Sequence, residues 1–147
     1  MALSGIAAAS VINSRARCAL TQNEAFISFV RYLRSQIECF AMPVPRAIGR
    51  CPQEILLGCG CAEAHEEDTP HFVGRCEVSD PQSVAIMRRF AADIGKGYVD
   101  EQLALCDYCL ALLEERRQSL CGSLPAKLRM NGALCIAGAL ALVILLI

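Results

Sequence analysis

Apolar side chains recur every three or four residues over residues 21–40, which is the spacing of one face of an α-helix. Thr21 and Glu24 have the spacing of a capping box, in which a hydroxyl and a carboxylate satisfy free backbone amides. They predict that the helix begins there, and Pro43 predicts that it ends before that residue. Residues 1–20 show no convincing period, so we expect a flexible or weakly helical lead.

Two further stretches have helical spacing. In residues 80–95, Asp80 is placed to cap the helix, Pro81 suits its first turn, and glycines follow its end. Residues 99–120 carry the broadest apolar stripe, with acids at the start and arginines at the end, as the helix dipole favours. The side chains that widen this stripe are Leu105, Cys109 and Leu112. Because so broad a stripe predicts burial on more than one side, we expect this helix near the centre of a bundle.

Between residues 41 and 80, proline and glycine are too frequent for long regular elements. One short helix is expected after Pro52, and the acidic run at residues 66–68 is expected to be a solvated loop. No stretch shows the alternating pattern of a strand. The predicted fold class is therefore all-α, a compact helical bundle over residues 21–123 with a hydrophobic central helix.

The run at residues 132–147 is apolar and uncharged. At about 1.5 Å per residue it reaches about 24 Å, which a bilayer core of roughly 30 Å can accept with local thinning. Lys127 and Arg129 lie in a short basic neck, residues 124–131, and place the bundle on the cytosolic side by the loop-charge rule. We expect a C-terminal transmembrane anchor, with a buried core helix and a removed lipid-anchor signal as the alternatives.

Composition narrows the class of protein. A net charge of −1, without a dense basic run, gives no electrostatic basis for binding nucleic acid. Ten cysteines would indicate disulfides in a secreted chain, but the N-terminal residues lack the charged start of a secretory signal. We therefore expect mostly reduced thiols that act as small buried apolar side chains.

Soft metal ligands gather over residues 51–76, where zinc could take four of them. The separation of Cys59 and Cys61 by one residue is shorter than the usual spacer of a zinc site, so free thiols are favoured over zinc and over a disulfide. The candidate ligands are Cys59, Cys61, His65, His71 and Cys76. No catalytic triad, phosphate-binding loop or paired-carboxylate motif is present, so we expect neither an enzyme nor a cofactor.

Two stretches resemble parts of the Bcl-2 family of apoptosis regulators. Residues 29–36 are similar to the first-helix homology region of the myeloid-leukaemia-type members. Residues 87–94 are similar to the family's death-signature helix, with Ala92 where the hallmark aspartate would stand. The first-helix motif comprises Phe29, Val30, Tyr32 and Leu33.

A second register is open and slightly preferred. In it, residues 90–99 resemble the turn at the floor of the family's groove, which leads into the central helix at residues 99–120. The death-signature helix would then fall at residues 55–66. The tryptophan and arginine of that turn are missing here.

The resemblance implies a compact, divergent member of the kind that viruses carry. Such a protein would regulate, and by that comparison inhibit, apoptosis by holding death-signature helices of pro-apoptotic partners in an apolar groove. It would face the cytosol from the mitochondrial outer membrane or the endoplasmic reticulum. The groove residues would be Met87, Phe90, Ile94, Val99 and Leu103.

Two other interpretations remain. One is a structural membrane protein whose anchor self-associates, which would give a homodimer. The other is a zinc-binding adaptor built on residues 51–76.

Overall fold

The computed structural model describes the backbone of residues 2–63 and 65–146, and the side chains of residues 14–63 and 65–123. Every regular element in these residues is a helix and none is a strand, so the predicted all-α class is confirmed. The helices in order are α1 (Ala2–Phe40), α2 (Val44–Gly49), α3 (Gln53–Cys59), α4 (Thr69–Arg75), α5 (Pro81–Asp93) and α6 (Val99–Leu146).

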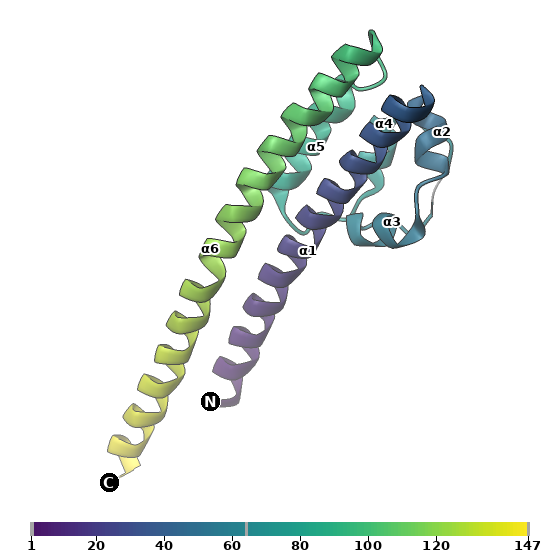
Figure 1. The fold of residues 1–147 in the computed structure, drawn as a ribbon. Helices are drawn as coiled ribbons and strands as arrows, with labels where there is room; N and C mark the ends of the chain where they lie inside the picture. The colour runs from purple at the N-terminus through teal and green to yellow at the C-terminus, as the bar shows by residue number, and fades with distance from the viewer. Residues whose placement is uncertain (1, 64, 147) are drawn as a thin grey trace.

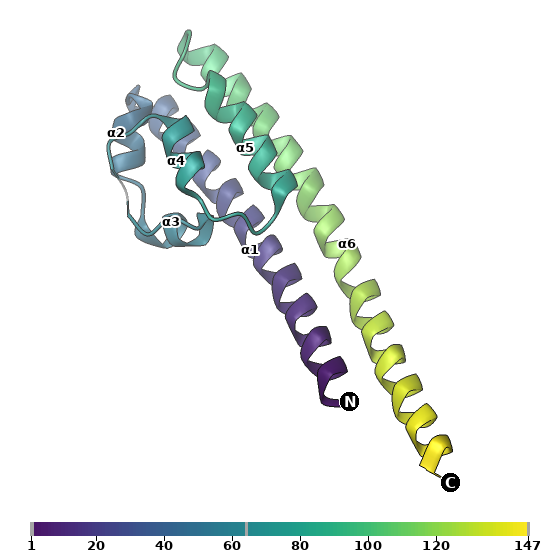
Figure 2. The ribbon, with the colours of Figure 1, turned by 180° about the vertical axis from the view of Figure 1, so that it is seen from behind.

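The long helices α1 and α6 lie side by side and run in opposite directions (Figures 1 and 2). α5 packs along α6, and the short helices α2, α3 and α4 form a lobe next to α1 (Figure 1). In the described part of the chain α1 packs against α2, α3, α5 and α6 and also touches α4 through a ring stack, whereas α6 packs against α1 and α5. The central helix is therefore α1, and the expectation that residues 99–120 form it is wrong.

Burial explains this correction. Phe26, Phe29 and Leu33 of α1 are completely buried. By contrast, Leu105 and Leu112 of α6 are only half-buried, and α1 and α5 are the helices that contact α6 in the described part of the chain. A broad apolar stripe indicates either a central helix or a helix that borders an open groove, and here the second case holds.

Two predicted helix boundaries are wrong. α1 runs straight through Thr21, because the alanine-rich stretch before it favours helix strongly enough to override the capping signal. α6 continues past its predicted end at residue 120, through Gly122 and Pro125, because leucine, alanine and lysine around them also favour helix. At both positions the helical preference of the neighbouring residues thus overrides a local signal for a helix boundary. The division of the chain into lead, body, neck and anchor remains a prediction.

Other local predictions are confirmed. α5 begins after Asp80, whose Oδ2 accepts a hydrogen bond from the Ser83 amide at 3.0 Å. It ends before Gly95, which takes the left-handed conformation with φ of 86°. α3 follows Pro52, and residues 66–68 are irregular. The short helices α2 and α4 were not expected.

Among the residues that the structure describes, no helix is long and apolar enough to cross a membrane. The expected anchor at residues 132–147 lies outside the residues whose side chains are described. It remains a prediction.

Candidate functional site

A polar network inside the protein fixes α5 against α1 and α6. Asp80 accepts hydrogen bonds from the Ser83 hydroxyl at 2.6 Å and from Arg116, whose Nη2 lies 2.7 Å from Oδ1. The Ser83 hydroxyl also accepts a hydrogen bond from Asn23 Nδ2 at 2.8 Å. Arg116 lowers the pKa of Asp80 to about 2, and its effect outweighs the burial that raises that pKa. Asp80 is therefore ionised where the three helices meet.

An apolar groove lies on the surface between α5 and α6, beside this network. One hollow has a volume of about 370 Å³, and a second of about 380 Å³ shares three of its lining residues. Together they follow α5 from Gln82 to Asp93, which is about three helical turns. Apart from alanines, the apolar lining is Ile86, Phe90, Leu105, Tyr108, Cys109 and Leu112.

Charged side chains mark the length of the groove. Arg89 borders both hollows, Asp93 borders one of them, and Glu115 borders the other. Arg89 makes no ion pair with any residue whose side chain is described, unlike Arg116, which pairs with Asp80. An unpaired guanidinium beside an apolar surface can recognise an acidic group on a bound molecule.

The structure does not bring the five predicted groove residues together on one surface. Phe90 lines the groove, although most of its side chain is buried. Met87 and Ile94 belong to the hydrophobic core. Val99 is exposed and Leu103 is half-buried, and neither lines the groove.

Sequence reasoning missed Arg89 and Tyr108 as groove residues. Leu105, Cys109 and Leu112 were recognised only as the side chains that widen the stripe of α6. That extra width was the available signal, because a second apolar face requires a second covering surface. Nothing in the sequence shows which face remains open.

The first-helix motif residues build the core. The ring of Phe29 stacks on Phe72 of α4 with 4.5 Å between centroids. Val30 and Leu33 are completely buried, and the Tyr32 hydroxyl donates to the Ala47 carbonyl at 3.2 Å. In this structure these four side chains hold α1 to its neighbours.

The candidate zinc ligands separate into two kinds. Cys61 and Cys76 are buried with their sulfurs 3.3 Å apart, and Cys59 is also buried. His65 and His71 are exposed, and His65 Nε2 lies 3.4 Å from Glu63. Within the described residues, no group of three or more ligands is close enough to hold a metal ion.

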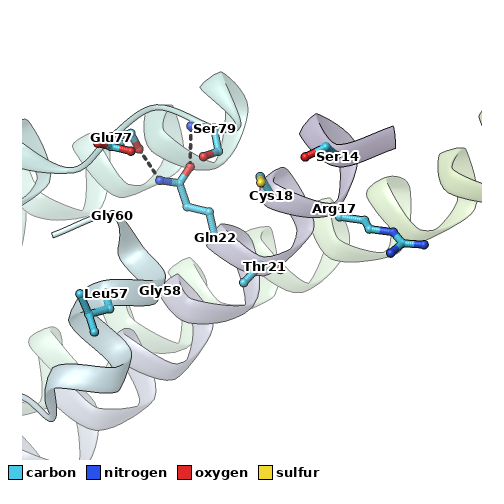
Figure 3. A pocket seen from close by; sticks show the side chains of 10 residues that line it. All are labelled: Ser14, Arg17, Cys18, Thr21, Gln22, Leu57, Gly58, Gly60, Glu77 and Ser79. Carbon is cyan, nitrogen blue, oxygen red and sulfur yellow. Dashed lines mark hydrogen bonds between the residues drawn. The ribbon is translucent and has the colours of Figure 1, made fainter. Parts of the chain in front are cut away.

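A larger cavity of about 490 Å³ lies between α1, α3 and the segment that joins α4 to α5 (Figure 3). Its central side chain is Gln22, whose amide nitrogen donates to the carbonyls of Cys59, at 3.1 Å, and Glu77. Its oxygen accepts from the Ser79 amide at 3.0 Å. Since these bonds tie α1 to two other segments, Gln22 holds the lobe in place and offers little to a ligand.

No family model, no curated protein and no solved structure matches this chain.

Proposed function

We propose that this protein binds an amphipathic helix of a partner protein in the groove between α5 and α6. The observation that carries the proposal is an apolar groove about three helical turns long, with the unpaired Arg89 midway along it. Partner helices in such grooves present anchors at positions i, i+3, i+4 and i+7, which need two to three turns.

The energetics suit this type of occupant. Burying three or four apolar anchors contributes about 1.5–3 kcal/mol each before the costs of association and ordering are subtracted. Phe90, Leu105 and Tyr108 supply the surface on which those anchors would lie. An acidic residue on the partner helix would face Arg89, which fixes the direction in which the helix binds.

The identity of the occupant rests on the resemblance to the Bcl-2 family. In this proposal the bound helices are death-signature helices of pro-apoptotic partners, and their capture restrains apoptosis. Residues 132–147 would anchor the protein in the mitochondrial outer membrane or the endoplasmic reticulum, with the groove in the cytosol. A protein that only self-associates through its anchor would bind none of these helices.

The test measures binding of fluorescent synthetic death-signature peptides to the full-length protein in detergent micelles. We expect at least one peptide to bind with a dissociation constant of about 1 μM or below. Arg89→Glu should weaken that binding about tenfold, because it places like charges face to face. Arg88→Glu is the matched control, since Arg88 is the exposed neighbour that does not line the groove.

Exchanging the acidic residue of the peptide for lysine should restore binding to the Arg89→Glu variant and weaken binding to the wild type. Equal losses in the Arg88 and Arg89 variants would contradict a site at Arg89. Failure of every peptide to bind would contradict the proposed function.

A further inference from the structure

Two cysteine sulfurs lie unusually close together, away from the groove. The Sγ atoms of Cys61 and Cys76 are 3.3 Å apart, although the residues are fifteen positions apart in the chain. Cys61 follows the end of α3, and Cys76 follows the end of α4. Both sulfurs also lie near the Phe72 carbonyl, at 3.7 and 3.4 Å.

The backbone beside the two sulfurs keeps them in place. The Glu77 amide donates to the Gly60 carbonyl at 3.3 Å, so the residues next to each cysteine are joined directly. Gly60 has φ of 89°, and a Cβ there would lie 2.9 Å from the Glu77 nitrogen. The Cys61 amide is bonded to the Leu56 carbonyl at 2.9 Å. Bringing the sulfurs to bonding distance therefore requires movement of the side chains rather than of the lobe.

Cys61 differs in reactivity from Cys76 and from the other buried cysteines. Hydrogen bonding from Cys76 lowers the pKa of Cys61 more than burial raises it, whereas the same hydrogen bond and burial both raise the pKa of Cys76. Burial instead raises the pKa of Cys106 to about 11 and that of Cys109 to about 12. Only the thiolate is strongly nucleophilic, so Cys61 is the more reactive sulfur. Ala62, which follows Cys61, and Glu77, which follows Cys76, are both exposed, so the pair lies just beneath the surface.

We propose that Cys61 and Cys76 form a redox-active pair that closes to a disulfide in the presence of a peroxide. This inference does not depend on the groove. The Cys61 thiolate attacks one peroxide oxygen, a sulfur–oxygen bond forms, and the oxygen–oxygen bond breaks. The hydroxide released takes up the proton that Cys61 gave up and becomes water.

In the second step the Cys76 sulfur attacks the Cys61 sulfur. The sulfur–sulfur bond forms, the sulfur–oxygen bond breaks, and a second water leaves with the proton of Cys76. The two thiols lose two electrons in total, and the peroxide gains them.

The disulfide would close the segment that carries α4. Phe72 of α4 stacks on Phe29 of the central helix. Closure of residues 61–76 reduces the freedom of the unfolded chain, so oxidation stabilises the packing of α4 on α1. A reduced protein would retain the same fold with a lower unfolding temperature.

The experiment oxidises the full-length protein with hydrogen peroxide, blocks remaining thiols with N-ethylmaleimide, and maps peptides without reduction. We expect a Cys61–Cys76 linked peptide at least tenfold more abundant than any other cysteine pair. The thermal midpoint should rise by about 10 °C on oxidation.

Cys76→Ser should abolish that rise and leave Cys61 as a sulfenic acid that dimedone traps. Cys39→Ser is the control, because Cys39 is exposed and lies on α1, and it should retain both the linked peptide and the rise. Absence of the linked peptide in the wild type would overturn the proposal. So would a purified protein that holds one zinc ion per chain and forms the link only after chelation.

Discussion

Asp80 shows how one residue positions the groove. Its side chain is 5% exposed, yet it is ionised, because Arg116 and the Ser83 hydroxyl and amide all donate to it. Removing a carboxylate from water without such donors would raise its pKa. The pair joins the start of α5 to α6, and so sets the spacing of the two helices that border the groove.

This pair predicts a loss of stability in acid. Arg116 lowers the pKa of Asp80 from its ordinary 3.8 to about 2, so the unfolded chain binds more protons than the folded one between these values. The contribution of ionised Asp80 is complete above about pH 4 and is lost as the pH falls towards 2. Urea unfolding followed by circular dichroism measures it.

Asp80→Asn should lower the free energy of unfolding at pH 7 by about 2 kcal/mol, because a helix cap and a charged partner of Arg116 are lost. The difference from the wild type should shrink between pH 4 and pH 2. Asp93→Asn, which changes an exposed aspartate at the other end of α5, is the control. A difference that stays constant with pH would contradict the ionised pair.

At the scale of helices, Gly58 determines how closely α3 packs on α1. A Cβ at Gly58 would lie 2.7 Å from the Cβ of Ala25, which cannot move aside because it belongs to the central helix. Gly122 of α6 has no atom near the corresponding position. Replacing Gly122 with alanine therefore changes helix preference alone, whereas replacing Gly58 with alanine also changes the packing of α3 on α1.

Gly58→Ala should destabilise the protein by about 1–3 kcal/mol, because overpacking outweighs the better helix preference of alanine. Gly122→Ala should stabilise it by up to about 1 kcal/mol. Thermal unfolding of both variants checks this. Stabilisation by Gly58→Ala would show that α3 does not pack on α1 as described.

The helix boundaries and the groove show how much of the structure the sequence could predict. α5 was predictable because Asp80, Pro81 and Gly95 are local signals at its two ends. The start of α1 was not, because the preference of twenty preceding residues overrode the signal at Thr21. The groove was predicted only through Phe90, since the exposure of Tyr108 depends on which face of α6 packs against α1.

For the whole molecule, the antiparallel pair of α1 and α6 forms the frame (Figure 2). An apolar groove lies between α5 and α6. In the proposed function, a partner helix occupies this groove. Tyr108 and Tyr98 are both exposed, by 64% and 81%, but only Tyr108 lines the groove. Together they allow the site of binding to be located directly.

The most direct measurement replaces each tyrosine in turn with a photoreactive benzophenone side chain and crosslinks a bound death-signature peptide. We expect at least fivefold more crosslinked peptide from position 108 than from position 98. Equal yields from the two positions, or none from position 108 while the peptide still binds, would contradict binding of the partner helix in this groove.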